Sequence, residues 1–235
     1  LTSRLSWVQI PHPPVKAAAR QPLLSPGTVL TADALARMMI CKTREKHMPG
    51  TTIKHMSSPL LTTSRLLLRP FVLEDAPALF SWASDTEVTR FLRFAAHSDI
   101  EESRKVITRW IEESRRPPFF HWAIVRRSDD RTIGSIGLEI QSLHDNRGEA
   151  GYCIAKHAWN QGYATESLTA VLDFGLERAG FHRIEACHSV ANTASGKVMR
   201  KAGMLLEAGP LHHYYRADML GYQDAMMYVA FSEHF

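Results

Sequence analysis

Residues 152–172 read Tyr-Cys-Ile-Ala-Lys-His-Ala-Trp-Asn-Gln-Gly-Tyr-Ala-Thr-Glu-Ser-Leu-Thr-Ala-Val-Leu. The first four residues continue a strand-like run, and Leu168, Val171 and Leu172 recur at the spacing of an amphipathic helix. Gly162 lies in the polar loop between these two patterns. The stretch therefore predicts a strand, a tight loop and a helix that ends near Gly180.

The loop around Gly162 has the chemistry of an anion site. The N-terminus of a helix carries unsatisfied N–H groups and a partial positive charge, so it binds phosphate well. Gly162 lets a ligand approach the backbone closely, and Ala164 is small. A tight turn without a ligand is the alternative, because one glycine is weaker evidence than a complete Gly-x-x-x-x-Gly-Lys-Ser phosphate loop.

The flanking sequence predicts a mixed α/β sheet with one strand-loop-helix crossover near its middle. Helix signals include a capping box at Ser98-x-x-Glu101 and a stop at Pro117-Pro118. The expected elements are a strand at 66–71, helices at 74–83 and 98–116, strands at 121–127, 132–140 and 149–156, the helix after Gly162, a strand at 183–190, a helix at 193–201, and strands at 204–208 and 222–231.

The basic character of the chain lies at its N-terminus. The net charge is +4, but residues 1–55 contain eight Lys or Arg against two acidic residues, so residues 56–235 are slightly acidic. Because a nucleic-acid-binding body needs a basic face, we expect no nucleic-acid partner; binding through the basic leader is the alternative. We expect residues 1–57 to be a disordered or non-native leader, with a transit peptide as the alternative, and residues 58–235 to form a single domain.

The cysteine and hydropathy patterns indicate the environment of the protein and its lack of certain ligands. Three cysteines without a Cys-x-x-Cys pair suit a reducing, cytoplasmic environment. The pair His212-His213 lacks a carboxylate or cysteine at metal-ligand spacing. The longest apolar runs are far shorter than the roughly 18 residues of a membrane span. We therefore expect no metal and no membrane association. Cys153 and Cys187 are interpreted as small core residues, and the isolated His121, His157 and His188 as hydrogen-bonded structural residues.

A second polar motif follows the strand at 183–190. Asn192 has the position of a helix N-cap, and Ser195 lies in the first turn of that helix. Together the motifs resemble the GNAT acetyltransferase superfamily, and within it the ribosomal-protein N-terminal (alanine/serine) acetyltransferases. The segments that carry this resemblance, between about Leu60 and Phe231, are Ser64–Pro70, Gly134-x-x-Gly137, Glu149–Tyr152, Trp159–Glu166, Asn192-x-x-Ser195, Lys201–Met204 and Asp224. Trp159 stands where the superfamily has Gln or Arg, and Met204 where it has Phe.

The resemblance implies a GNAT-like fold: a central, mostly antiparallel sheet with a splayed strand pair and flanking helices. It also implies that a primary amine attacks acetyl-CoA directly while both are bound, so that the chain is an acyl-CoA-dependent N-acetyltransferase. Ser195 would give a proton to the leaving thiolate. The implied cofactor-binding residues are Tyr152, Cys153, Ile154, Ala155, Gln161, Gly162, Tyr163, Ala164, Thr165, Asn192 and Ser195.

Two carboxylates are candidates for the general base that deprotonates the amine. Glu149 is the first, because it matches the subgroup's Glu before Gly-Tyr. Glu139 is the second, because it lies on the polar side of a strand expected to pair with that of Glu149. A solvated or salt-bridged carboxylate is the alternative for each.

The acceptor amine stays open at this point. A protein N-terminus is one candidate, and Arg90 and Arg93, in the segment expected to line the acceptor site with Tyr214 and Tyr215, favour an acidic peptide over a polycation. A small-molecule amine, such as a polyamine or an aminoglycoside, is the alternative. A non-catalytic acyl-CoA sensor would need neither Ser195 nor a carboxylate. A monomer and a homodimer are both compatible with the sequence.

Overall fold

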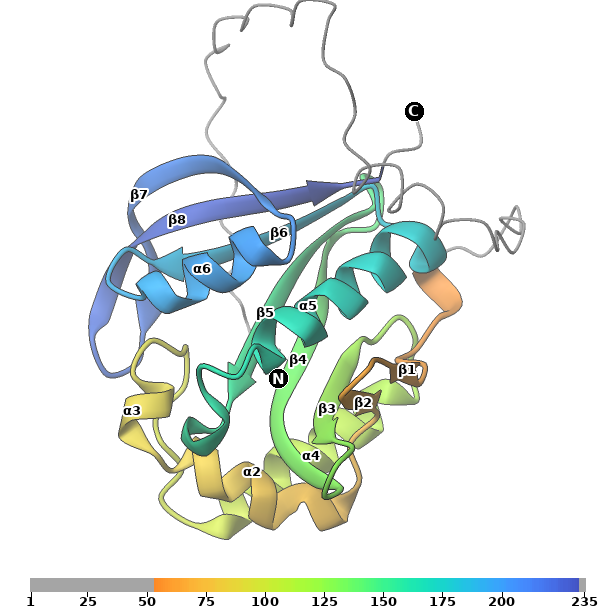
Figure 1. The fold of residues 1–235 in the computed structure, drawn as a ribbon, viewed down its shortest axis with the longest axis vertical. Coiled ribbons are helices and arrows are strands. Elements are labelled where there is room, and N and C mark those ends of the chain that lie inside the picture. The colour runs from red at the N-terminus through yellow and green to blue at the C-terminus, as the bar shows by residue number, and fades with distance from the viewer. Residues whose placement is uncertain (1–52, 233–235) are drawn as a thin grey trace, which may run out of the picture. The chain divides into compact units, whose positions relative to one another are not determined.

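The structure is a computed structural model that describes residues 53–232, without the side chain of Lys54. Eight strands form one sheet in the order β1-β2-β3-β4-β5-β6-β8-β7 (Figure 1). Among these described strands, β5 and β6 run parallel and the other neighbouring pairs are antiparallel. The mixed, mostly antiparallel sheet is therefore confirmed. The strands are β1 (Leu61–Thr62), β2 (Leu66–Arg69), β3 (His121–Arg126), β4 (Arg131–Ser142), β5 (Arg147–Ile154), β6 (Arg183–Ser189), β7 (Leu205–Ala217) and β8 (Gly221–Phe231).

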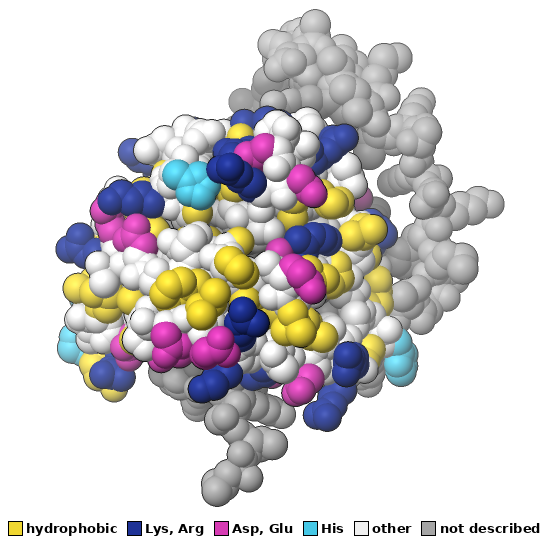
Figure 2. Space-filling model, turned by 90° about the horizontal axis from the view of Figure 1, so that it is seen from below, with side chains coloured by type: hydrophobic (Ala, Val, Ile, Leu, Met, Phe, Trp, Pro, Cys, Tyr) yellow, Lys and Arg dark blue, Asp and Glu magenta, His cyan; other side chains and the backbone are white. Residues whose placement is uncertain are grey.

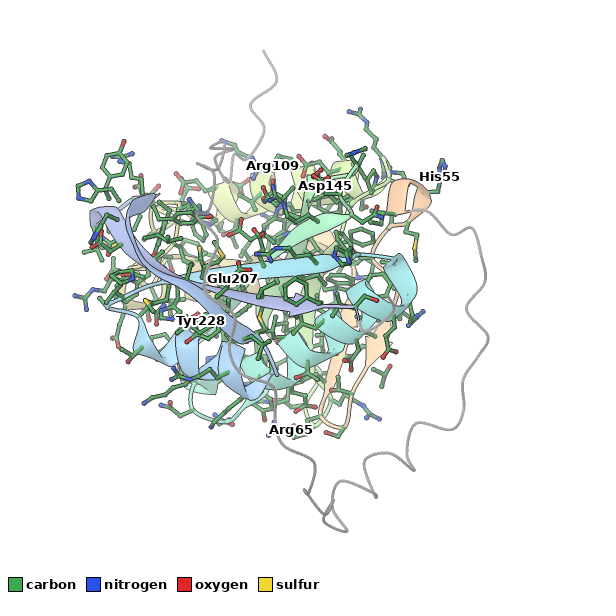
Figure 3. All side chains as sticks on the ribbon, turned by 90° about the horizontal axis from the view of Figure 1, so that it is seen from above. His55, Arg65, Arg109, Asp145, Glu207 and Tyr228 are labelled. Atoms are coloured by element: carbon green, nitrogen blue, oxygen red, sulfur yellow. The ribbon has the colours of Figure 1, made fainter. Side chains whose placement is uncertain are left out.

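Helices cover both faces of the sheet. The α-helices are α2 (Ala76–Ala83), α3 (Thr86–Thr89), α4 (Ile100–Ser114), α5 (Tyr163–Asp173) and α6 (Thr193–Lys201), and a π-helical turn, Phe174–Ala179, extends α5. Short 3-10 turns occupy Ile53–His55, Leu73–Asp75 and Lys156–Ala158. Figure 3 shows α5 and α6 on the side of the sheet where Arg65 lies, and Arg109 of α4 on the opposite side.

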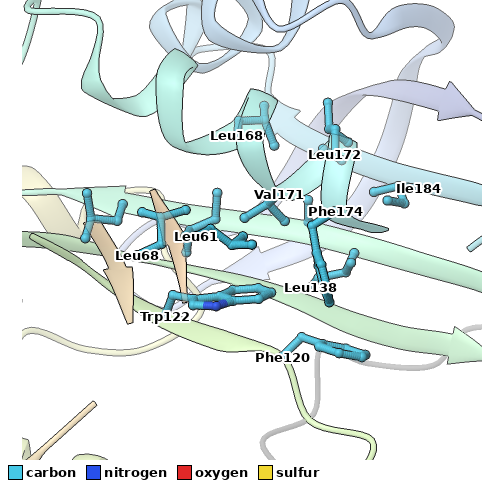
Figure 4. Packing of buried hydrophobic residues seen from close by; sticks show 14 of the residues in the cluster. Leu61, Leu68, Phe120, Trp122, Leu138, Leu168, Val171, Leu172, Phe174 and Ile184 are labelled. Atoms are coloured by element: carbon cyan, nitrogen blue, oxygen red, sulfur yellow. The ribbon is translucent and has the colours of Figure 1, made fainter. Parts of the chain in front are cut away.

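The apolar stripe of α5 explains why this helix packs on the sheet. Leu168, Val171 and Leu172 are buried, as their spacing predicts, and face the side chains of Trp122 and Leu138 (Figure 4). Burying one such aliphatic side chain stabilises the fold by about 1.5–3 kcal/mol. The helix ends at Gly180, whose φ of 84° is the left-handed conformation expected there.

The central parallel pair opens into a splay. β5 and β6 pair only where Arg147–Glu149 lies beside Arg183–Glu185. Beyond that point β5 continues to Ile154 and β6 to Ser189 without pairing to each other, and Figure 1 shows the two strands diverging. We call this divergence the splay. Among the described residues, it leaves the inner edge of β5 beyond Glu149 without a strand partner.

Two local predictions need correction, and two short elements were not predicted. The N-cap of α4 is Asp99, which accepts hydrogen bonds from the N–H groups of Glu101 and Glu102, so the predicted box at Ser98 and Glu101 is one residue off. β7 extends past Pro210 to Ala217; a proline is tolerated because β7 is an edge strand with irregular register. The four-residue α3 and two-residue β1 are too short to give a periodic signal.

The predicted leader, residues 1–57, lies mainly outside the described residues. Of its last residues, Ile53 is buried in the core and Ser57 forms a bridge with Phe119. On the face that carries α2 and α4, acidic and basic side chains are interspersed (Figure 2). Within residues 53–232, no helix combines the length and the apolar composition that a membrane crossing requires.

Candidate active site

The predicted loop forms the N-terminus of α5. Gly162 is the N-cap with φ 82°, a left-handed conformation that disfavours residues with a Cβ, and Asn160 has φ 59°. The first intrahelical hydrogen bond runs from Glu166 N–H to the Gly162 carbonyl at 3.0 Å. The N–H groups of residues 162–165 precede this bond and have no intrahelical acceptor. Since Gly162 has no side chain to cap them, they are suited to an anion.

Ser195 and Tyr152 meet across the splay. Asn192 caps α6, and its Oδ1 accepts from the Ser195 N–H at 3.4 Å, which confirms both predicted positions on this helix. The Tyr152 hydroxyl lies 2.8 Å from Ser195 Oγ and donates to the Ser195 carbonyl at 3.1 Å. Burial raises the pKa of Tyr152, so its phenol stays neutral. A strand residue thus holds the first turn of α6.

Glu149 lies on the opposite face of β5 from Tyr152, because side chains alternate along a strand. Its Oε2 accepts from Gln141 Nε2 at 3.2 Å, and its Oε1 accepts from the Cys187 thiol at 3.6 Å. Burial raises the pKa of the Glu149 carboxyl, and the positive charge of Arg93 partly offsets this effect. A carboxylate with a raised pKa is a better proton acceptor than a solvated one.

Glu139 is the residue directly opposite Glu149 in the antiparallel ladder of β4 and β5. The predicted pairing of these two strands is therefore confirmed, and both side chains lie on the same face of the sheet. The structure brings the two candidate carboxylates together as cross-strand neighbours.

The segment before α4 and the hairpin of β7 and β8 cover the face of the sheet on which Glu149 lies. The Arg93 guanidinium lies 4.7 Å from the centre of the Tyr215 ring, and the Tyr215 hydroxyl donates to the Phe91 carbonyl at 3.2 Å. Burial raises the pKa of Tyr215 to about 12. The pKa of Tyr214 is raised as well, by burial and by the nearby Glu149. Segments distant in sequence thus surround Glu149.

The isolated histidines have structural surroundings. The His121 ring lies 4.1 Å from that of Trp110, and burial together with Arg109 lowers its pKa to about 3, so it is neutral. His188 Nδ1 donates to the Ser189 carbonyl at 2.7 Å. His121 is therefore held by ring packing, although a hydrogen bond was expected. For His188 the expected hydrogen bond is confirmed. The His157 carbonyl accepts from Gln161 Nε2 at 3.0 Å.

His212 and His213 lie beside a carboxylate that is distant from them in the sequence. Asp224 lies next to them across the hairpin: its Oδ2 is 2.9 Å from His212 Nδ1, and its Oδ1 accepts from the His213 N–H at 2.9 Å. Sequence spacing missed this carboxylate because strand pairing supplies it. Within the part of the chain that the structure describes, no group of three or more His, Cys, Asp or Glu residues could hold a metal ion.

Sequence reasoning also missed Arg65, which precedes β2. Its Nη1 donates to the Gln161 carbonyl at 2.9 Å, so it contacts the loop directly. The residue lies in the motif that predicts the opening strand, and its distance of 96 positions from Gln161 hides the contact.

The fold and the arrangement of residues around the splay can now be compared with known protein families. The profile of the Acetyltransferase (GNAT) domain matches residues 65–205, more than half of the chain. The chain therefore belongs to the GNAT acetyltransferase family, which confirms the superfamily predicted from the sequence.

Individual relatives support the same assignment. The uncharacterised N-acetyltransferase YoaA of Bacillus subtilis (strain 168) is 33% identical over 156 residues, 66% of this chain and 88% of the relative. Among solved structures, RimL, a ribosomal L7/L12 alpha-N-protein acetyltransferase in complex with coenzyme A, has a TM-score of 0.65 at 20% identity and covers 75% of this chain and 100% of its own. Spermidine N-acetyltransferase from Vibrio cholerae, in complex with CoA and spermine, has a TM-score of 0.62 at 16% identity, with 72% and 97% covered. At these identities the two structures show the fold alone.

Proposed function

We propose that the protein is an N-acetyltransferase that moves an acetyl group from acetyl-CoA to a primary amine by direct attack in a ternary complex. The observation that carries this proposal is the splay of β5 and β6, flanked by the Gly162-capped helix and by Ser195. Two proteins of the same fold, RimL and spermidine N-acetyltransferase, have been solved with coenzyme A, which supports the choice of donor.

The donor side, defined as the loop 160–165 with Tyr152, Asn192 and Ser195, fits coenzyme A. The N–H groups of residues 162–165 would bind the pyrophosphate. In the part of the chain that the structure describes, the inner edge of β5 has no strand partner beyond Glu149, so its backbone groups would bond to the pantetheine amides. Acetyl-CoA supplies the activated thioester, and the chain supplies its orientation.

The proposed proton transfers use side chains on the two faces of β5. Glu149 would take the proton of the acceptor ammonium, directly or through water, because burial keeps its pKa above the usual range. The free amine then forms the C–N bond as the C–S bond breaks. Ser195 would donate its hydroxyl proton to the departing thiolate, with Tyr152 holding the hydroxyl at 2.8 Å. The nitrogen of the new amide then gives up its surplus proton, which returns to Ser195 directly or through water. Glu139, opposite Glu149, is the second candidate for the base.

The acceptor side is defined as Arg93, Glu149, Cys187, Tyr214 and Tyr215. We propose a protein N-terminal amine as the acceptor, supported by the resemblance to the ribosomal-protein acetyltransferases and by a cationic residue, Arg93, whose charge acts on Glu149. A polycation would be repelled by Arg93. A small amine such as a polyamine is the alternative that the likeness to spermidine N-acetyltransferase supports. The cytoplasmic location and the monomeric or homodimeric state stay predictions.

A thiol-release assay tests the function. Acetyl-CoA is incubated with the protein and with peptides of varied N-terminal sequence, spermidine or an aminoglycoside, and free CoA is followed over time. Amine-dependent release of CoA is expected, fastest with acidic peptides. A protein that binds acetyl-CoA but releases no thiol with any amine would instead be an acyl-CoA sensor.

A further inference from the structure

Arg65 lies against the loop that begins α5. Its Nη1 donates to the Gln161 carbonyl at 2.9 Å, and its guanidinium carbon lies 4.6 Å from the centre of the Tyr163 ring. A Cβ added at Gly162 would lie 3.4 Å from Arg65 Nη2. Figure 3 shows Arg65 at the margin of the molecule on the side of α5 and α6. The Arg65 side chain therefore contacts Gln161 and Tyr163 and lies beside the glycine between them.

Arg65 also holds Glu166 in the first turn of α5. Its Nε and Nη2 both lie 2.7 Å from Glu166 Oε2. Oε1 of the same carboxylate accepts from Thr63 Oγ1 at 2.6 Å and from the Arg65 N–H at 2.9 Å. Burial alone would raise the pKa of Glu166, but these hydrogen bonds hold it below the usual range. The carboxylate is thus ionised and is directed to the segment before β2.

The contact of Arg65 with the Gln161 carbonyl also sets the direction of the next N–H group. In a planar trans peptide, the carbonyl of one residue and the N–H of the next point in opposite directions. Arg65 fixes the Gln161 carbonyl, so the Gly162 N–H must point away from Arg65. That N–H is one of the donors without an intrahelical acceptor.

We infer that Arg65 is a positioning residue of the pyrophosphate site, an inference that rests on the proposed function. It fixes the Gln161–Gly162 peptide so that the N–H faces the anion, and it pairs with Glu166, whose charge would otherwise compete with phosphate for the helix N-terminus. An arginine is required because its planar fork serves the carbonyl and the carboxylate at once; a lysine ammonium cannot reproduce both contacts.

Calorimetric titration with coenzyme A tests this role in the full chain. The variants are Arg65→Met, Arg65→Lys and the control Arg127→Met. Arg127 is a matched residue because it donates to the carbonyls of Thr63 and Ser64 at 2.9 and 3.1 Å and has no hydrogen bond to the loop. Both Arg65 variants should weaken coenzyme A binding by about tenfold, the scale of one charge-assisted contact. The control should bind like the wild type.

A second substrate separates positioning from general damage to the fold. S-acetylpantetheine lacks the pyrophosphate, so the wild type and Arg65→Met should use it with the same kcat/KM in the thiol-release assay. Equal losses with S-acetylpantetheine and with acetyl-CoA would overturn the inference, as would full affinity for coenzyme A in Arg65→Met. Full affinity in Arg65→Lys would show that charge alone suffices and would overturn it too. A wild type that binds no coenzyme A would instead remove the proposed function.

Discussion

The donor side and the acceptor side lie on opposite faces of β5 and are built in different ways. The donor side comes mainly from two short segments, 160–165 and 192–195, each at the N-terminus of a helix. The acceptor side combines side chains from β5, β6, β7 and the segment before α4. Backbone groups dominate the first, and titratable side chains dominate the second.

Because the two sides are built differently, substitutions on each side should change different properties of the protein. Changes on the donor side should alter affinity for coenzyme A, because the loop acts through backbone N–H groups that a ligand must reach. Changes on the acceptor side should alter turnover and its pH dependence while leaving coenzyme A binding intact. The variants below test this division, beginning with the largest expected effect.

Gly162→Trp should abolish coenzyme A binding, with Kd raised at least about 100-fold. Gly162 has φ 82°, so any side chain strains the loop, and an indole that started 3.4 Å from Arg65 Nη2 would displace the residues that fix the direction of its N–H groups. Calorimetric titration measures the effect. Gly203→Trp is the matched control, since Gly203 has φ 91°, no atom within 4 Å of the position that a Cβ would take, and a place at the far end of α6. Equal binding by both variants would mean that the loop is only a turn.

Glu149→Gln should lower kcat/KM by about 100-fold, the scale of a lost general base, without changing the Kd of coenzyme A. The amide keeps the volume of the side chain but cannot take a proton. The cross-strand neighbour supplies the control, because Glu139→Gln removes a carboxylate from the same face. A larger loss in the Glu139 variant would transfer the role of base to that residue.

Ser195→Ala and Tyr152→Phe should each lower kcat by about tenfold, because a thiolate leaves without full protonation. The two hydroxyls lie 2.8 Å apart, so the double variant should lose no more than Ser195→Ala alone. Tyr228→Phe is the control: its hydroxyl lies on the same side of the sheet but accepts from Arg200. Additive losses would show that Tyr152 acts independently of Ser195.

The smallest effect is expected for the pH dependence of kcat/KM in a variant of Arg93. Glu149 must be ionised to act as the base, so activity is lost as pH falls through its pKa; because burial raises this pKa, the acidic limb lies above the usual range of a glutamate. Arg93 stabilises the carboxylate, so Arg93→Met should move the limb to still higher pH. Arg90→Met, in the same segment but stacked on Phe91, should leave it unchanged. Profiles of kcat/KM with one peptide check this, and an unmoved limb in the Arg93 variant would contradict it.

The same difference explains how much the sequence could predict. The strand, loop and helix around Gly162 and the caps of α6 follow from local patterns, because backbone conformation and helix periodicity are encoded within a few residues. The mixed sheet followed from the order of the predicted elements and the splayed pair from the family resemblance, and the strand register confirms both.

Contacts between distant segments could not be predicted in this way. The pair Asp224 and His212 arises from strand pairing, and the contact of Arg65 with Gln161 joins residues far apart in the chain. The length of β7 was missed because Pro210 is a strand breaker everywhere except at an edge, and edge position is a property of the whole sheet.

Thermal unfolding of the wild type with and without acetyl-CoA tests whether the donor side binds coenzyme A. A ligand that binds only the folded state raises the melting temperature, and at a concentration about 100 times Kd it adds about 2.7 kcal/mol of stability. Acetyl-CoA should raise the melting temperature of the wild type clearly and saturably and leave that of Gly162→Trp unchanged. An unchanged melting temperature of the wild type at saturating acetyl-CoA would contradict it.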